Sequence, residues 1–416
     1  MARAVLAERP ATFGDALRVR EFRAVFLAQL FSELGDQLAR VALSVLVYRA
    51  SNSPLLTALA YALTYLPAAI GGPLLGPIAD RAPRRRVMVV SALLAAGLVA
   101  LMAVPGMPLG LLFVLLAGAT LLQGPFEAAR AALLPDLLTG DKYVAGQSLG
   151  RLLNQSSQVV GFAFGGLLLS WLSPRHALAI DAVTFVFAAL ILQFGVAERP
   201  VARTGELRRF AQDIKDGARI VFSSPLLRSL VALAWAGTAF TVVPEALAAP
   251  YAHHLHGGAP TTGLILAAGP VGTAVGVVVI SRMVAPTLRM RLIAPLAFLA
   301  CLPLIICLAD PGLGLLLALL VISGMAMSFN VPANQAFVLA LAPGVRGRAF
   351  GLAAGGLAIG QGLSLLFAGV IADWVQPQVV VGLAGVTGAA CMAVITTLSG
   401  FQANLTSVSE DALEAA

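Results

Sequence analysis

The fold is decided by one stretch of sequence, Gly76-Pro77-Ile78-Ala79-Asp80-Arg81-Ala82-Pro83-Arg84-Arg85-Arg86. It lies between two long apolar runs. Glycine allows two helices to approach closely, and an aspartate at a helix end is placed to meet basic side chains. Arginine offers a fork of donors to a carboxylate or to the carbonyl end of a helix. The stretch therefore predicts a short, basic connection between two membrane-length helices.

Apolar runs continue outward from this loop in both directions. Of the 416 residues, 59% are hydrophobic and 11% are charged, a balance that a soluble domain of this length does not have. Runs of about 18 residues at about 1.5 Å each cross a hydrocarbon core of about 30 Å. The sequence predicts an all-α polytopic membrane protein with twelve transmembrane helices, which begin near Val25, Leu56, Met88, Leu109, Gly150, Ala177, Leu226, Gly263, Leu292, Gly314, Gly347 and Val379.

The basic residues predict the orientation. If the N-terminus is cytoplasmic, most of the 27 lysines and arginines fall in inside segments, and the outside loops hold only Arg49 and Arg175. We therefore expect a multi-pass protein of the bacterial cytoplasmic membrane with both termini cytoplasmic and no cleaved signal peptide. The net charge of +7 is then a topology signal, and no nucleic-acid partner is predicted.

A hydrophilic stretch divides the chain into two halves. We expect an N-terminal six-helix bundle over residues 1–196, a cytoplasmic linker over 197–224, and a C-terminal six-helix bundle with a short tail over 225–416. Within the linker, Asp213 to Phe222 has an amphipathic pattern suited to a membrane surface. Two similar bundles can rock about a site at their interface.

Three segments carry a resemblance to a known family. The loop at Gly76–Arg86 resembles the signature between helices 2 and 3 of the major facilitator superfamily, with Pro83 where glycine is usual. Residues 161–166, Gly-Phe-Ala-Phe-Gly-Gly, are similar to the family's antiporter motif without its proline. Residues 28–48 and 126–136 resemble the branch that contains enterobactin-type siderophore exporters and macrolide exporters.

The resemblance covers residues 20 to 400 and has definite implications. It implies the major facilitator fold, with twelve transmembrane helices in two six-helix bundles, and transport by alternating access. It also implies a cytoplasmic gate, for which we expect Asp136 to be a partner of one arginine. The alternative is that the arginines only anchor the loop and set the topology. The gate residues are Gly76, Asp80, Arg81, Arg84, Arg85 and Asp136.

Ionisable residues inside a membrane cost about 2.5–3.5 kcal/mol each and need a reason. Glu33 and Asp36 share one helix face at i,i+3, and Arg40 follows one turn later. Two like charges in a low dielectric favour binding of a proton by one of them, which suits a proton-coupled exporter. The alternative is a neutral Asp36–Arg40 pair, with Glu33 bound to a neighbouring helix.

Further polar residues are candidates for the cavity. Glu127 and Arg130, also at i,i+3, form either a gating pair or a fixed structural ion pair. Asn154, Gln158 and Gln361 either line a cavity or make hydrogen bonds between helices. We expect Asp181 and Glu245, in contrast, to be interfacial or in contact with other helices and not central.

No metal site, cofactor or enzyme active site is predicted. His253, His254 and His256 match no closed metal site and have no acidic residue near them in sequence, so a solvated loop is expected. No GxxxxGK[ST] string is present that would bind ATP. No paired-carboxylate or HxxxH string indicates an enzyme.

Together, these patterns predict a secondary active transporter. We expect a proton-coupled exporter of small amphipathic molecules, such as a drug in multidrug or antibiotic resistance, a secondary metabolite or a siderophore. Its partners are this small-molecule substrate, protons and the lipid bilayer, and we expect a monomer. The alternatives are an importer or a lysophospholipid flippase of the same fold, a membrane-embedded enzyme, or a sensor that transports nothing.

Overall fold

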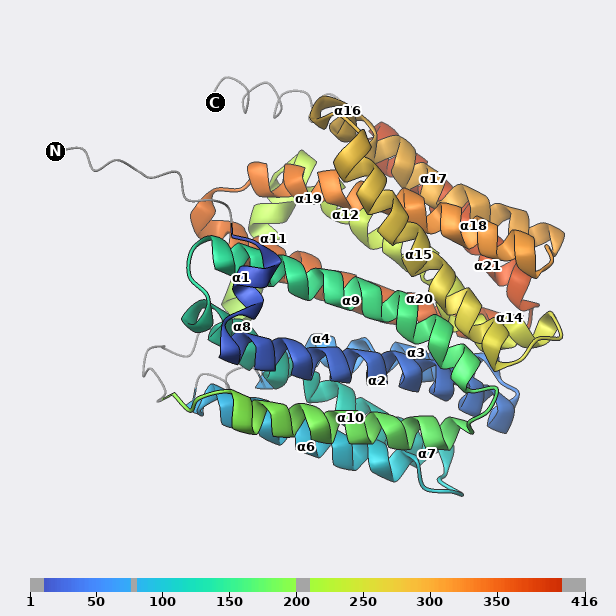
Figure 1. Ribbon diagram of the computed structural model, residues 1–416. Helices are drawn as coiled ribbons and strands as arrows, with labels where there is room; N and C mark the ends of the chain where they lie inside the picture. The colour runs from blue at the N-terminus through green and yellow to red at the C-terminus, as the bar shows by residue number, and fades with distance from the viewer. Residues whose placement is uncertain (1–10, 76–80, 200–209, 399–416) are drawn as a thin grey trace.

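The computed structural model describes residues 11–75, 81–199 and 210–398, and these residues form helices and turns with no strand. In the N-terminal half the helices are α1 (Phe13–Leu17), α2 (Arg20–Ser51), α3 (Pro54–Ala62), α4 (Leu66–Leu75), α6 (Arg84–Met102), α7 (Leu109–Leu121), α8 (Gln123–Leu137), α9 (Asp141–Leu168) and α10 (Pro174–Gly195). Helices α3 and α4 together form one span, as do α7 and α8 (Figure 1).

The C-terminal half repeats this organisation. Its helices are α11 (Phe210–Ser223), α12 (Pro225–Thr241), α13 (Val243–Ala246), α14 (Ala248–His254), α15 (Ala259–Met283), α16 (Pro286–Arg291), α17 (Ile293–Ile305), η1 (Ile306–Ala309), α18 (Leu313–Ala326), η2 (Met327–Phe329), α19 (Asn330–Leu339), η3 (Pro343–Val345), α20 (Arg346–Ala372) and α21 (Pro377–Leu398). Helices α12 and α13 form one span, and α18, η2 and α19 form another.

Twelve crossings follow from these helices. Nine spans in the described part of the chain are long and apolar enough to cross a membrane. Helix α17 with η1 is a shorter apolar segment, Ile293–Ala309. Helices α2 and α9, with 32 and 28 residues, are long enough but carry charged and amide side chains along one face. Most predicted starts agree with the structure, but α9 begins at Asp141, well before the predicted Gly150, because its first two turns are polar.

Serine–proline pairs start three of the spans. Ser53, Ser173 and Ser224 each precede the proline at the first position of α3, α10 and α12. Each serine oxygen accepts a hydrogen bond from a backbone N–H one turn later, at 3.2–3.4 Å. The serine satisfies a free donor, and the proline has no N–H to satisfy, so these pairs fix where the spans begin.

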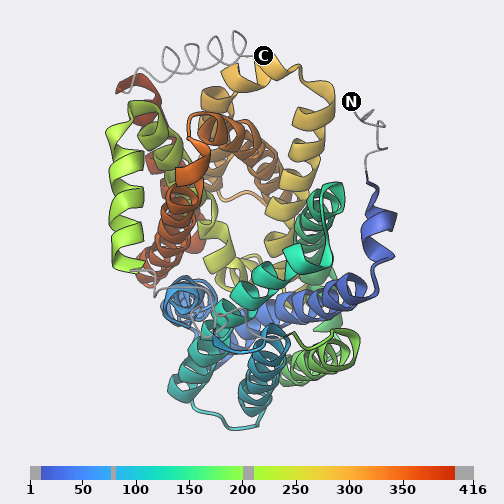
Figure 2. The same cartoon turned by 90° about the vertical axis from the view of Figure 1, so that its left-hand side faces the viewer.

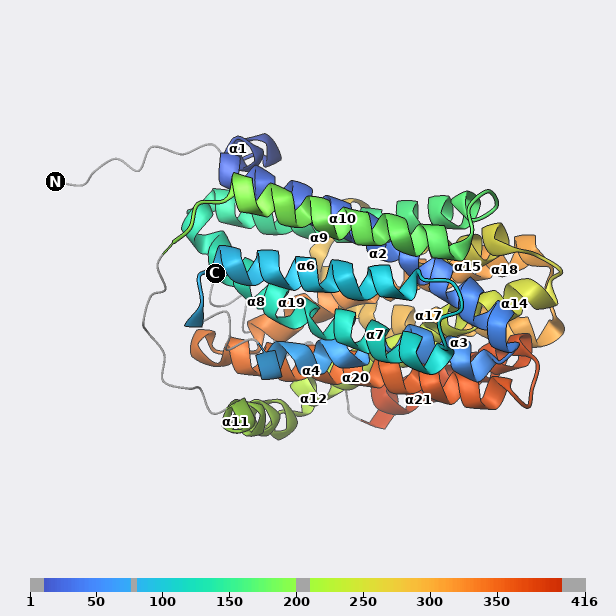
Figure 3. The same ribbon diagram turned by 90° about the horizontal axis from the view of Figure 1, so that it is seen from below.

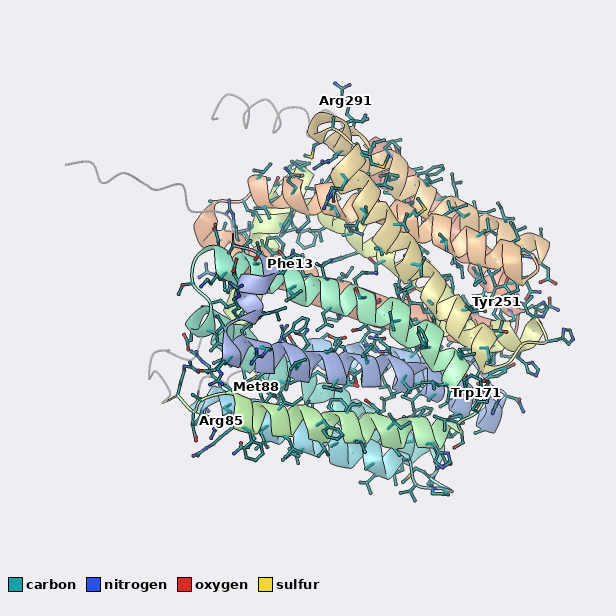
Figure 4. All side chains as sticks on the ribbon, in the orientation of Figure 1. Phe13, Arg85, Met88, Trp171, Tyr251 and Arg291 are labelled. Atoms are coloured by element: carbon teal, nitrogen blue, oxygen red, sulfur yellow. The ribbon has the colours of Figure 1, made fainter. Side chains whose placement is uncertain are left out.

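The bundle has two distinct ends. Arg85 and Arg291 mark one end, which we call the basic end, and Trp171 and Tyr251 mark the other, which we call the far end (Figure 4). The two halves pack through α9 against α15 and through α3 and α4 against α20. Helices α9 and α15 meet at the far end and diverge toward the basic end (Figure 1), and the two halves are seen side by side from the basic end in Figure 2.

Glycines permit the closest contact between the halves at the far end. A methyl group on Gly166 would lie 2.7 Å from the Cα of Gly263, and one on Gly369 would lie 2.5 Å from the Cβ of Ala58. Such distances are too short for any larger residue, so backbone lies against backbone here. The far end is therefore closed.

Helix α11, in the predicted linker, lies outside the bundle and packs against α20, whose direction it crosses (Figure 2 and Figure 3). Asp216 of α11 and Arg348 of α20 form an ion pair at 3.6 Å, and a methyl group on Gly217 would lie 2.7 Å from the Arg348 carbonyl oxygen. The predicted amphipathic segment is thus a helix, and it is attached to the C-terminal half at the basic end.

Candidate functional site

A cavity of about 670 Å³ lies inside the N-terminal half. Helices α2, α6, α8, α9 and α10 line it, and along α2 it extends from Phe22 near the basic end to Arg40. It brings together six of the predicted site residues, Glu33, Asp36, Arg40, Glu127, Arg130 and Asn154. The polar faces of α2 and α9 therefore face this cavity, which explains why these two helices are less apolar than the rest.

Glu33 is held by amides and not by a cation. Its carboxylate accepts two hydrogen bonds from Nδ2 of Asn154 on α9, at 3.1 and 3.2 Å. Gln158 in turn donates to Oδ1 of Asn154 at 3.0 Å. No lysine, arginine or histidine in the described part of the chain lies within 4.0 Å of the Glu33 carboxylate. Glu33 is thus bound to a neighbouring helix and has no cation within ion-pair distance.

Glu127 and Arg130 pair directly. Nε of Arg130 donates to both carboxylate oxygens of Glu127, at 3.1 and 2.9 Å, and Nη2 donates to Oε2 at 2.5 Å. Nη1 of Arg130 donates to Oε1 of Gln29 on α2 at 3.1 Å. The guanidinium therefore connects α8 to α2 at the side of the cavity nearer the basic end.

Asp36 and Arg40 do not form an ion pair. The nearest polar contact of the Arg40 guanidinium is Oε1 of Gln37 at 3.5 Å, and its Cζ lies 5.4 Å from the centre of the Tyr65 ring. Within the described residues no carboxylate lies within 4.0 Å of it. Asp36 and Arg40 also line a smaller cavity of about 40 Å³ with Asp181, which is only 2% exposed. Asp181 is in contact with another helix, α2, as predicted, but it also lines a cavity, which was not expected.

A second cavity of about 230 Å³ lies between the halves. Gln155 and Gln158 of α9 line it from the N-terminal side, and Gln361 of α20 lines it from the C-terminal side. Gln155 lines both large cavities and donates across the interface to the Pro270 carbonyl at 3.1 Å. A cavity therefore lies at the predicted interface, and the cavity of about 670 Å³ lies to one side of it.

Glu245 lines this second cavity, near the end of the span Pro225–Ala246 and in contact with another helix, as predicted. Its carboxylate accepts a hydrogen bond from the Tyr61 hydroxyl of the opposite half at 3.0 Å. The cavity lining and the bond to the opposite half could not be predicted, because both depend on how the halves pack.

At the basic end the arginines of the predicted gate bind acidic groups and a helix end. Arg84 forms an ion pair with Asp136 at the end of α8. Arg85 donates to Glu198 at 2.8 Å and to the carbonyl oxygens of Val196 and Gln193 at 3.2 and 3.3 Å.

The Val196 and Gln193 carbonyls, to which Arg85 donates, belong to the last turn and C-cap of α10, where positive charge is favourable. The structure describes only part of the remaining predicted gate. Arg81 is exposed, and Gly76 and Asp80 lie outside the described residues.

The histidine cluster was predicted to be a solvated loop, but two of its histidines contact other side chains. Nε2 of His254 lies 3.0 Å from Oδ1 of Asp310, and the ring of His253 packs edge-on against Tyr48 at 5.5 Å. An acidic partner is thus present, although it is distant in sequence. Among the described residues no group of three or more histidines, cysteines or acids could hold a metal ion.

Comparison with known proteins gives a consistent result. The family model for the Major Facilitator Superfamily matches residues 25–246 and 236–407. Two Bacillus subtilis (strain 168) proteins, the uncharacterized MFS-type transporters YfiS and YkuC, are 29% and 24% identical over 208 and 228 residues. These alignments cover 48% and 52% of this chain and 49% and 53% of the relatives, so the chain spans about half the length of the curated relatives it matches.

Solved structures resemble the whole chain in fold. A bacterial homolog of the human lysosomal transporter Spinster, in an inward-facing conformation, superposes with a TM-score of 0.65 at 17% identity, covering 93% of this chain and 97% of that one. The nucleoside transporter NupG gives 0.69 at 12%, covering 91% and 98%. The peptide transporter POT in complex with sulfate gives 0.69 at 14%, covering 93% and 95%.

Proposed function

Since the chain belongs to the major facilitator superfamily, a family of transporters and not of enzymes, we propose that this multi-pass membrane transporter is a proton-coupled exporter of small amphipathic molecules. The observation that carries the proposal is the cavity of about 670 Å³ in which Glu33 has only amide partners. An unpaired carboxylate in a cavity lined partly by Phe22, Phe26 and Phe126 suits a molecule with a positive or neutral polar group and an apolar body.

Proton movement supplies the driving force. Each proton that moves inward across the membrane is worth about 2.3 kcal/mol per 100 mV. Carboxylates at Glu33 and Asp36 can bind protons and release them as access alternates between the two sides. An inward proton current can therefore drive cargo outward.

The basic end is cytoplasmic in this proposal, which also places both termini in the cytoplasm. The positive-inside distribution of arginines supports this orientation. The closed contacts Gly166–Gly263 and Ala58–Gly369 then lie on the outer side, so this conformation faces inward. The arginines at Arg84 and Arg85 form the cytoplasmic gate, and segment 197–224 links bundles 1–196 and 225–416.

The fold does not determine which molecule is transported. The structural relatives are named for nucleosides and for peptides, and their identity to this chain is 12% and 14%. Export of drugs or secreted metabolites is favoured by the unpaired acid and by the sequence resemblance of residues 28–48 and 126–136 to exporters. A siderophore cargo would need cationic contacts, for which Arg151 on the cavity wall is available.

Everted membrane vesicles from an efflux-deficient bacterial host provide the test. With a proton gradient, vesicles that contain the protein should accumulate ethidium or Hoechst 33342 above empty-vector vesicles, and an uncoupler should abolish the difference. Macrolides and catecholates are tested in parallel. Accumulation only in right-side-out vesicles would indicate an importer, and gradient-independent movement of lysophospholipid would indicate a flippase; either result contradicts the proposal.

A further inference from the structure

Asp181 is the most deeply buried carboxylate in the described part of the chain, and a glycine on α2 makes room for it. A methyl group on Gly35 would overlap with Oδ1 of Asp181 and with Oγ1 of Thr184. Helix α10 therefore packs directly on the backbone of α2 at this point. The carboxylate of Asp181 lies beside the residue that precedes Asp36.

Asp181 and Asp36 share the smaller cavity with one cation, Arg40. At about 40 Å³ this cavity has room for about one water molecule. Its other polar walls are neutral, contributed by Thr64, Thr120 and Gln123. The ionisable groups that line it are Asp36 and Arg40 from α2 and Asp181 from α10. Glu33 of α2 and Tyr65, from the turn between α3 and α4, do not line the cavity but interact electrostatically with Asp36 and Arg40. Helices α6 and α7 contribute no ionisable side chain to its lining.

The charges in this cavity do not balance without a proton. Two carboxylates and one guanidinium leave one negative charge, and an uncompensated buried charge costs several kcal/mol. A single bound proton removes that cost. We propose that Asp181 and Asp36 together form the proton-binding unit of this transporter, with one proton shared between α10 and α2. This inference rests on the proposed proton coupling, and it moves the proton site away from Glu33.

Arg40 connects this unit to the interface between the halves. Its guanidinium lies over the ring of Tyr65, which packs against Tyr61 with ring centres 6.0 Å apart. Tyr61 donates to Glu245 of the opposite half. When the shared proton leaves, the second carboxylate attracts Arg40 away from Tyr65, and the contact across the interface changes with it. Glu33, held by Asn154, remains available for cargo.

Infrared difference spectroscopy of the purified, full-length protein in lipid tests this inference without any cargo. On titration from acid to alkaline pH, the wild type should lose a carboxylic-acid C=O band. The band should be absent in Asp181→Asn and in Asp36→Asn. In either variant the charge of the remaining carboxylate is balanced by Arg40, so this carboxylate stays ionised and binds no proton. It should remain in Glu33→Gln. The series is repeated with Glu245→Gln, which removes the carboxyl of the second cavity.

Each outcome decides the question. Loss of the band in both aspartate variants, with retention in Glu33→Gln, supports the shared site. A band that persists in Asp181→Asn, or that disappears in Glu33→Gln, overturns it. If Asp181→Asn is not monodisperse, Asp181→Glu, which keeps a carboxyl, should retain a band and Asp36→Asn should still lose it; any other result contradicts the pair.

The same data separate this inference from the proposed function. A titrating Asp36–Asp181 band in a protein that moves no dye leaves the proton site standing and refutes the exporter. Gradient-driven ethidium accumulation that survives in both Asp36→Asn and Asp181→Asn refutes the proton site and leaves the exporter standing.

Discussion

Arg130 bonds to two residues on two helices, and the shape of its side chain makes this possible. Nε and Nη2 engage Glu127 on the same helix while Nη1 reaches Gln29 on α2. A guanidinium can do this because its donors lie in one plane with fixed directions, whereas a lysine ammonium is a single compact charge. The contact therefore depends on arginine specifically and not only on positive charge.

We expect Arg130→Lys to lower the free energy of unfolding by about 1.5 kcal/mol, since it keeps the charge but loses the bidentate contact and the bond to Gln29. A thermal-shift assay in detergent, combined with a double-mutant cycle against Glu127→Gln, measures the coupling. Gln29→Ala serves as the matched control. It should lower the free energy of unfolding by less, because it removes only the hydrogen bond between Arg130 and the neutral amide of Gln29. If Arg130→Lys is as stable as the wild type, the contact is not structural, and the gating role is favoured.

Single residues also show where sequence-based reasoning stops. Glu33, Asp36 and Arg40 could be placed on one cavity because they share a helix, and helical spacing fixes their common face. The cavities that Asp181 and Glu245 line could not be predicted, because the residues across from them, Asp36 and Tyr61, are on other helices. The depth of a residue in a span says nothing about which neighbour it faces. The pairing of His254 with Asp310, 56 residues away, was out of reach for the same reason.

At the scale of helices, the closed far end depends on two kinds of contact, one apolar and one polar. The apolar contact is the backbone approach of α9 and α15 at Gly166 and Gly263. The polar contact joins α20 to α3: Asp373 accepts from the backbone N–H of Leu55 at 3.1 Å and from the Ser53 hydroxyl at 3.2 Å. A carboxylate at a helix N-terminus satisfies free donors and interacts favourably with the helix dipole. Helix α3 is therefore capped in part by the opposite half of the molecule.

We expect Asp373→Ala to weaken far-end closure by about 1 kcal/mol, or about fivefold in the ratio of closed to open conformers. The measurement is the distance between spin labels on cysteines that replace Arg49 and Trp374, one in each half, in a variant without the three native cysteines. Gln376→Ala, also at this end but without a bond to α3, is the control. An unchanged distance distribution in Asp373→Ala would show that the cap contributes nothing to closure.

We expect Gly166→Leu to have a larger effect than loss of the cap. A side chain there meets the backbone of Gly263 and the Ala259 carbonyl oxygen, at 2.7 and 2.8 Å from its first carbon, and backbone cannot move aside as a flexible side chain can. The far end should stay open, and dye accumulation in everted vesicles should fall at least tenfold. Gly97→Leu is the matched control, because a Cβ there meets nothing within 4 Å. Normal transport by Gly166→Leu would mean that the far end need not close.

At the scale of the whole molecule, the sequence predicts the twelve crossings, the two halves and the basic end. These features follow from composition, length and charge position, which act locally along the chain. The presence of a large cavity inside the N-terminal half, beside the one between the halves, could not be predicted. It depends on how far α2, α9 and α15 tilt from one another, and tilt is a property of packing between helices that no single helix encodes.

Because α9 and α15 meet at the far end and diverge toward the basic end, we can predict how the two halves move. If the molecule alternates by rocking its halves, the two ends must move in opposite senses about the interface at Gln155. Labels on cysteines at Lys142 and Arg291, at the basic end, should therefore give a long distance whenever the Arg49–Trp374 pair at the far end gives a short one. Acidification, which loads carboxylates in the cavity, should change both distributions together, and Asp36→Asn should remove that pH response while leaving both conformers present. Distances that change at one end only would mean that the halves do not rock as rigid bodies, because two rigid bundles that pivot about a common interface cannot open at one end without closing at the other.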